Sequence, residues 1–247
     1  MIPGLANPDP SSPRCPCGQM QTGAARPERV VARGLVGFAV GVLLQCALTA
    51  GLQPSVGWRL TLALLPLHVL ALGASLTRLL CGVPRPQWPA RCGFGALSPT
   101  VFRQVFGCML CGLPLVYLLH AGSAGLCRLL GLGPALPGAF GMLAEMTSAG
   151  ARTAAVLVLV LWVPLAEELL FRYLLTDALD GVGVRGAGLW SAAAFAAAHG
   201  SVAQLPPLLV LGLLLQRLRR EPGGLWGPLI AHSAFNGLSL LGWALLG

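Results

Sequence analysis

The sequence contains no lysine, so its 16 basic residues are all arginine, and it has only 8 acidic residues. Charged residues make up 10% of the chain and hydrophobic residues 55%, with a mean hydropathy of +0.76. Soluble domains carry about 25% charged residues, so this composition excludes an ordinary soluble domain and indicates an integral membrane protein. The arginines lie between apolar runs rather than together on a polar surface, which argues against a nucleic-acid partner.

Motifs of several common function classes are also absent. The chain has no HExxH zinc motif, no nucleotide-binding glycine loop, no internal repeat and no soluble second domain. Several of its 8 cysteines lie in apolar runs, which favours small buried side chains over a disulfide framework. Cys108 and Cys111 have CxxC spacing, but on a membrane helix that spacing only places two thiols on one face.

Apolar segments follow one another along most of the chain. Residues 1–30 are rich in Pro, Gly and Ser, so we expect a disordered tail there. Residues 31–150 would form N-terminal transmembrane helices and residues 151–247 a helical core. A bilayer crossing needs about 20 helical residues, which predicts an all-α multipass transmembrane bundle of about seven spans around a polar intramembrane cavity. The predicted spans are 35–52, 60–80, 102–120, 154–175, 188–203, 205–218 and 225–246.

Two of these spans, 188–203 and 205–218, are short and separated by Pro206 and Pro207. A proline pair interrupts a helix, so we expect the two segments to form a tight helical hairpin. Elsewhere the arginines distinguish the two sides of the membrane. With a cytosolic N-terminus, twelve arginines lie on the cytosolic side and three on the other, and positively charged loops favour the cytosol.

The span at 154–175 contains three charged residues within the stretch PLAEELLFR. Ionisable side chains inside a span are costly and mark functional sites by default. Glu168 and Arg172 are four residues apart on one helix face, where they can neutralise each other. Glu167 points to an adjacent face without a local cation, which makes it the candidate base.

Two later spans carry polar residues at the same spacing. Phe195 and His199 are four apart among alanines that allow another helix to approach closely. His232 and Asn236 are four apart in the last span. A rise of about 1.5 Å per residue places Glu167, His199 and His232 roughly 12, 16 and 10 Å from the cytosolic ends, so we expect the three to share one layer.

Three motifs therefore follow one another on successive spans. They are EExxxR at Glu167, Glu168 and Arg172, FxxxH at Phe195 and His199, and HxxxN at His232 and Asn236. Together they resemble the CPBP family, also called the Abi family, which includes the type II CAAX prenyl endopeptidases (Rce1-like). The resemblance covers about residues 150–247. Many bacterial members have a small residue after the motif arginine, where this chain has Tyr173, which could narrow the path beside the site.

The resemblance implies an intramembrane endopeptidase that needs no cofactor. Glu167 and His199 would activate a water for attack on the scissile carbonyl, because a desolvated carboxylate is a stronger base. His232 and Asn236 would stabilise the oxyanion. The remaining motif residues, Glu168, Arg172 and Phe195, would orient the site.

The resemblance also implies a substrate and a location. The substrate would be a lipidated protein or peptide, because the C-terminus of a prenylated protein can reach an intramembrane site laterally from the bilayer. Cysteine content and the Pro-rich leader favour a eukaryotic source, for which the endoplasmic reticulum membrane is expected. Membrane-protein partners are a further expectation.

Three other interpretations stay open. Glu167, Glu168 and Arg172 could form a buried ion cluster that only ties helices together. A Glu and two His could bind zinc, although the resemblance implies a metal-independent mechanism. The polar cluster could also hold a partner helix in a non-catalytic membrane scaffold.

Overall fold

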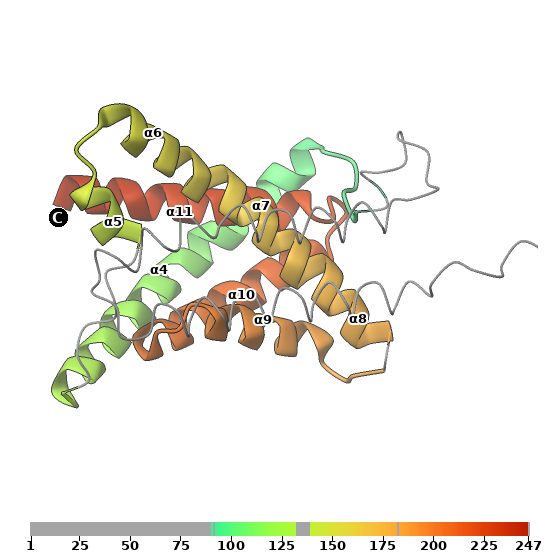
Figure 1. The fold of residues 1–247 in the computed structure, drawn as a ribbon. Helices are drawn as coiled ribbons and strands as arrows, with labels where there is room; N and C mark the ends of the chain where they lie inside the picture. Colours follow the sequence, from blue (N-terminus) through green and yellow to red (C-terminus); the bar gives the residue numbers. More distant parts are fainter. Residues whose placement is uncertain (1–89, 91, 132–138, 182, 247) are drawn as a thin grey trace, which may run out of the picture.

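The computed structural model describes residue 90 and residues 92–131, 139–181 and 183–246 (Figure 1). Within this part the chain is helical, and its one strand-like feature is an isolated antiparallel bridge between Phe94 and Gly224. The predicted all-α class is thus confirmed for the described residues. The predicted tail at 1–30 and the predicted spans at 35–52 and 60–80 lie outside them.

Each of the five later predicted spans overlaps a described helix, although the helix predicted at 188–203 ends at Ala198 and the one predicted at 102–120 continues to Leu129. The described helices are α4 (Pro99–Leu129), α5 (Ala139–Glu145), a continuous helix from Ala149 to Gly181, α9 (Ala187–Ala198), the short 3₁₀ helix η5 (Val202–Gln204), α10 (Leu205–Arg219) and α11 (Trp226–Leu246). Among the described residues, only α4 and the helix from Ala149 to Gly181 are long and apolar enough to cross a membrane by length and composition. The count of seven spans therefore stays a prediction.

The helix from Ala149 to Gly181 alternates between ordinary and widened turns. Its segments are α6 (Ala149–Leu157), the π-helix η3 (Val158–Trp162), α7 (Val163–Glu167), the π-helix η4 (Glu168–Leu175) and α8 (Thr176–Gly181). Pro164 has no N–H and its ring crowds the carbonyl of the preceding turn. The N–H of Val163 bonds to the carbonyl of Val158, five residues back, which is a widened turn. The charged motif therefore begins directly after a proline-disturbed turn.

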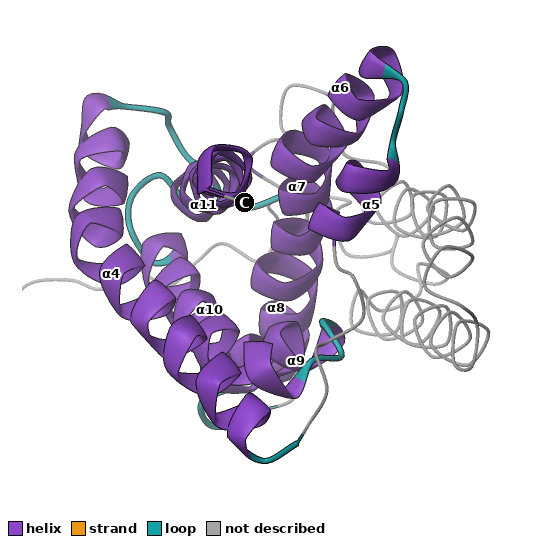
Figure 2. Cartoon of the chain, turned by 90° about the vertical axis from the view of Figure 1, so that its left-hand side faces the viewer, coloured by secondary structure: helices purple, strands orange, loops and turns teal. Residues whose placement is uncertain are grey.

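Helix α10 packs against α9, α4 and α11, while α11 also contacts η3 and α7. Figure 2 shows α11 end-on between α4 and α7. The predicted hairpin of the short helices is present as α9 and α10, with Pro206 and Pro207 in the first turn of α10, where a missing N–H is tolerated. Small residues allow this contact: a Cβ built on Gly212 would lie 3.0 Å from Ala192 Cβ.

The loop between α10 and α11 is fastened to the segment that precedes α4. Leu225 N–H donates to the Gly93 carbonyl at 2.9 Å, and Gly95 N–H donates to the Gly223 carbonyl at 3.2 Å. Gln104 Nε2 donates to Glu221 Oε2 at 2.8 Å. These bonds hold the loop before α11 against α4 and the segment that precedes it.

Gly212→Ala tests the contact between α9 and α10. Its methyl group would also lie 3.2 Å from Ala192 Cα, a backbone atom that cannot rotate away. We expect the free energy of unfolding to fall by about 1–3 kcal/mol. The control is Gly122→Ala in α4, where a Cβ meets nothing within 4 Å. Thermal unfolding of both variants in detergent checks the prediction, and equal midpoints would contradict it.

Candidate functional site

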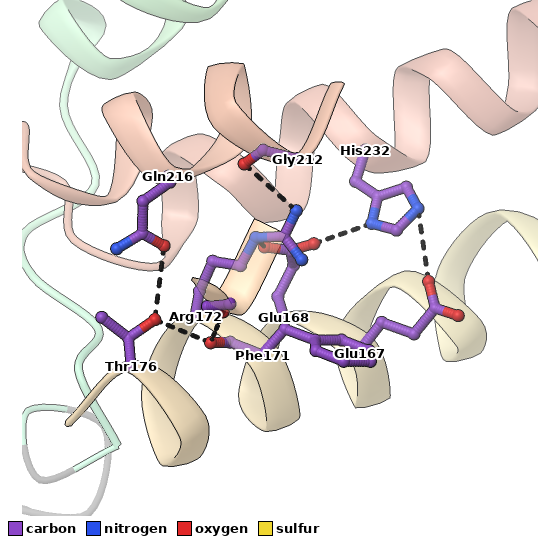
Figure 3. A network of polar contacts seen from close by, with 9 residues as sticks. Glu167, Glu168, Phe171, Arg172, Thr176, Gly212, Gln216 and His232 are labelled. Atoms are coloured by element: carbon purple, nitrogen blue, oxygen red, sulfur yellow. Dashed lines mark hydrogen bonds and ion pairs between the residues drawn. The ribbon is translucent and has the colours of Figure 1, made fainter. Parts of the chain in front are cut away.

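Glu168 is a buried carboxylate shared by two partners from different helices. Its side chain is 1% exposed, and its Oε1 accepts from His232 Nδ1 at 2.8 Å (Figure 3). Its Oε2 lies 3.2 Å from Arg172 Nε, which is the ion pair that the spacing predicts. The contact with His232 joins residues 64 apart in the chain, so helical spacing could not predict it.

Arg172 is held by charge and by an aromatic face more than by hydrogen bonds. It is completely buried, and its Cζ lies 4.3 Å from the centroid of the Phe195 ring. Its Nη2 donates to the Gly212 carbonyl at a long 3.4 Å. Its Nε and Nη1 have no hydrogen-bond partner among the described residues, because the approach to Glu168 has ion-pair distance without hydrogen-bond orientation. The cation is therefore stabilised mainly by Glu168 and Phe195.

Glu167 contacts the other ring nitrogen of His232. Its Oε2 is 3.5 Å from His232 Nε2, and its side chain is 24% exposed, against 3% for His232. The resemblance implied that Glu167 acts together with His199, and in the structure Glu167 contacts His232. Carboxylates only accept hydrogen bonds and a neutral imidazole has one N–H. Both ring nitrogens of His232 can therefore donate only when the ring is in its imidazolium form.

His199 lies at the end of α9 on an exposed surface. Its Nδ1 is 2.9 Å from the Phe195 carbonyl. A carbonyl oxygen only accepts, so Nδ1 is the donor, and Nε2 carries the lone pair of the neutral ring. The Phe195 ring lies 5.0 Å from the His199 ring and 5.6 Å from the His232 ring, edge-on to both. The Phe195 ring is thus in edge-on contact with both histidine rings.

The side chain of Asn236 is hydrogen-bonded to the backbone of a neighbouring helix. Its Nδ2 donates to the Leu159 carbonyl in η3 at 2.9 Å. One of its two amide hydrogens is therefore engaged by the backbone of the neighbouring helix. The structure brings Glu167, Glu168, Arg172, Phe195 and His232 into one connected set, with His199 joined through Phe195. Asn236 lies one turn along α11 from His232.

Three polar residues that the sequence analysis did not select support the widened turn η4. Ser191 Oγ donates to the Phe171 carbonyl, and Thr176 Oγ1 lies 2.8 Å from the same oxygen. Gln216 Oε1 lies 3.4 Å from Thr176 Oγ1, and Gln216 is buried. For Gln216 the sequence did contain a signal of a buried polar contact, because it is a single uncharged polar residue after an apolar run, in LLLQRL. Tyr173 lies beside Gly93, since a Cβ built there would be 3.4 Å from Tyr173 Cδ2.

The described residues contain no group of three or more His, Cys, Asp or Glu placed to hold a metal ion. In the same region Cys108 and Cys111 are free thiols, the former partly buried and the latter exposed. Their CxxC spacing therefore forms no disulfide. The site consists of protein groups that can exchange protons.

Comparison with known families agrees with the motifs. Residues 149–238 match the family model described as type II CAAX prenyl endopeptidase Rce1-like, which confirms the resemblance. The matched segment runs from the start of α6 into α11 and contains every motif residue. Neither the comparison with curated proteins nor that with solved structures gives a match. Residues 149–238 are therefore similar to the Rce1-like family of membrane proteases.

Arg172→Leu tests whether the buried carboxylate depends on its cation. The substitution leaves Glu168 charged and buried without Arg172, so we expect a loss of about 3–5 kcal/mol in the free energy of unfolding. The control is Arg219→Leu, which breaks the partly exposed ion pair of Arg219 with Asp177 and should cost no more than about 1 kcal/mol. Chemical unfolding in mixed micelles measures both variants. Similar losses would mean that Arg172 does not neutralise Glu168.

Proposed function

We propose that this chain is an intramembrane endopeptidase that removes the C-terminal residues of prenylated proteins, as CAAX processing requires. The observation that supports this best is the pair of unequal carboxylates on one buried histidine. Glu168 is fully enclosed and fixes His232, whereas Glu167 is partly open on the other side of the ring. This arrangement couples a fixed orienting group to an accessible base.

In this mechanism Glu167 removes a proton from a water molecule. The water oxygen forms a bond to the scissile carbonyl carbon, and the carbonyl oxygen becomes an oxyanion. His232 Nε2 lies on the Glu167 side of the ring. In the imidazolium form, in which Nδ1–H still donates to Glu168, the Nε2–H can stabilise the developing negative charge. Collapse of the tetrahedral species breaks the C–N bond, and the proton taken by Glu167 passes to the leaving amine. Glu168 holds His232 Nδ1 throughout.

His199 complements Glu167 from the exposed side. Its Nδ1–H is directed to the Phe195 carbonyl, so the lone pair on Nε2 is available to accept a hydrogen bond from the water and hold it while Glu167 removes the other proton. The resemblance implies this joint action of Glu167 and His199. It also implies an oxyanion contact for Asn236, for which the Nδ2 hydrogen not bonded to Leu159 would be the donor.

A prenylated C-terminus is the substrate that suits a site within apolar helices. The lipid remains in the bilayer while the adjoining peptide approaches from the side, which concentrates the substrate in two dimensions. Glu167 lies in a helix that is apolar and long enough to cross the membrane. In such a helix the partly exposed carboxylate of Glu167 would meet a peptide held at the membrane.

A non-catalytic scaffold is the second candidate function. It is favoured by the number of polar groups already bound within the bundle: His232 Nδ1, Arg172 Nη2 and Asn236 Nδ2 all donate to protein acceptors. Buried networks of this kind can fix helix register without catalysis. A scaffold would show no turnover, and its partner complex would assemble equally well with Glu167→Gln.

Glu167→Gln tests the enzyme. We expect cleavage of a farnesylated CAAX peptide by the purified chain to fall by about 10²–10⁴-fold, because the amide cannot accept the proton of the water. The control is Asp180→Asn, which removes an exposed carboxylate in α8 and should leave turnover unchanged. Full activity of Glu167→Gln would exclude this mechanism.

His199→Ala tests the second base. We expect the turnover number to fall by about 10²-fold or more, with a thermal midpoint close to that of the wild type because the ring is exposed. The matched control is His120→Ala, an exposed histidine in α4. Single-turnover cleavage rates distinguish loss of chemistry from loss of binding. A rate unchanged by His199→Ala would remove His199 from the mechanism.

A further inference from the structure

We infer that Ser191 is a positioning residue for His199, because its hydrogen bond to the Phe171 carbonyl fixes the register of α9 against the helix that carries the two glutamates. The consequence for turnover rests on the proposed function. The bond itself is a property of the fold, and its effect on α9 can be measured without a substrate.

Helix α9 has few other contacts that could fix its register. Its sequence, AGLWSAAAFAAA, contains one hydroxyl side chain, Ser191, which is completely buried. Glycine and alanine form the contact with α10, where a Cβ on Gly212 would lie 3.0 Å from Ala192 Cβ, and such small side chains interlock little. Gly186 before α9 and Gly200 after it have φ of 75° and 65°, so neither connection continues as a helix.

Ser191 supplies a polar contact to the neighbouring helix. Its Oγ donates to the Phe171 carbonyl, which belongs to the π-helix η4. The same carbonyl accepts from the N–H of Thr176 and, at 2.8 Å, from Thr176 Oγ1 (Figure 3). Both Thr176 groups come from the same helix as Phe171, whereas Ser191 comes from α9. Removing the Ser191 hydroxyl would therefore release α9 and still leave the carbonyl paired.

Ser191 begins a row of contacts that ends at His199. Phe195 and His199 follow it at intervals of four residues, so the three lie on one helix face. The Phe195 ring centroid lies 5.5 Å from that of Phe171 and 4.3 Å from Arg172 Cζ. The Phe195 carbonyl accepts from His199 Nδ1 at 2.9 Å. The position set at Ser191 is therefore transmitted to His199 along two helical turns.

The register of α9 sets where His199 lies relative to Glu167. Helix α9 follows α8 after a short connection and packs against both α8 and η4, so it runs back along the helix that carries the glutamates. His199 is eight residues beyond Ser191, and Glu167 is four residues before Phe171. Both therefore lie on the same side of this hydrogen bond, and a shift of α9 along its axis would move His199 past Glu167.

A double-mutant cycle of Ser191→Ala with His199→Ala tests the inference. Misplacing a reacting group by about 1 Å can cost up to about 10²-fold in rate, so we expect Ser191→Ala to lower the turnover number for a farnesylated CAAX peptide by about 10-fold, with KM unchanged. In the His199→Ala background the same substitution should change turnover by less than about twofold, because no imidazole remains to be positioned. The thermal midpoint should fall by about 1–6 °C in both backgrounds.

The matched control is Thr176→Val, which removes the other hydroxyl from the Phe171 carbonyl and leaves α9 attached. Its thermal midpoint should also fall, while its turnover number remains that of the wild type. An equal loss of turnover from Ser191→Ala in both backgrounds would overturn the inference, because the effect would not act through His199. An unchanged turnover number in Ser191→Ala, or a matching loss in Thr176→Val, would do the same.

Hydrogen exchange of the backbone amides in α9 gives a measurement that needs no activity. We expect Ser191→Ala to speed exchange across Ala187–Ala198 by about fivefold or more, while Thr176→Val leaves it unchanged. If the wild type cleaves no peptide, the proposed function fails, and this measurement still decides whether Ser191 fixes α9. Equal exchange in the wild type and in Ser191→Ala would show that it does not.

Discussion

The buried carboxylate of Glu168 is the constraint on which the other contacts depend. An ionised group that is 1% exposed is costly unless its charge and lone pairs are matched. Arg172 matches the charge from the same helix, and His232 supplies a hydrogen bond from α11. Because both partners must be present together, this one side chain fixes the depth and rotation of α11 against the helix from Ala149 to Gly181.

The wide turns of that helix allow the arrangement. Pro164 disturbs the hydrogen-bond ladder just before the two glutamates, and the π-helix η4 carries Glu168 and Arg172 through the next turns. The Phe171 carbonyl in η4 accepts from Ser191 and Thr176, so polar side chains support the irregular backbone. Irregular helical turns often accompany functional sites. Here the irregularity is compensated by specific hydrogen bonds rather than left as strain.

The spacing of residues along the chain predicted the helices and the ion pair within one helix, but it did not predict the contacts between helices. Apolar runs predicted α4, α9, α10 and α11, and the four-residue interval predicted the Glu168–Arg172 ion pair. The contact of Glu167 with His232 joins two helices, and no interval in the sequence encodes it. The predicted fifth span extended to residue 203, but α9 ends at Ala198 and Gly200 takes a left-handed φ of 65°. His199 is therefore at a helix end and exposed.

Two adjacent glutamates with the same chemistry thus acquire different properties from their surroundings. One residue of helix rotation turns Glu168 toward Arg172 and leaves Glu167 at the edge of the cluster, with 24% of its side chain exposed. A carboxylate that is held by a cation and an imidazole is poorly placed to exchange protons with a substrate, whereas a loosely contacted one beside the same imidazole can do so. The stability of the enclosed glutamate is therefore what permits its neighbour to remain accessible, because His232 is fixed from one side and open to Glu167 on the other.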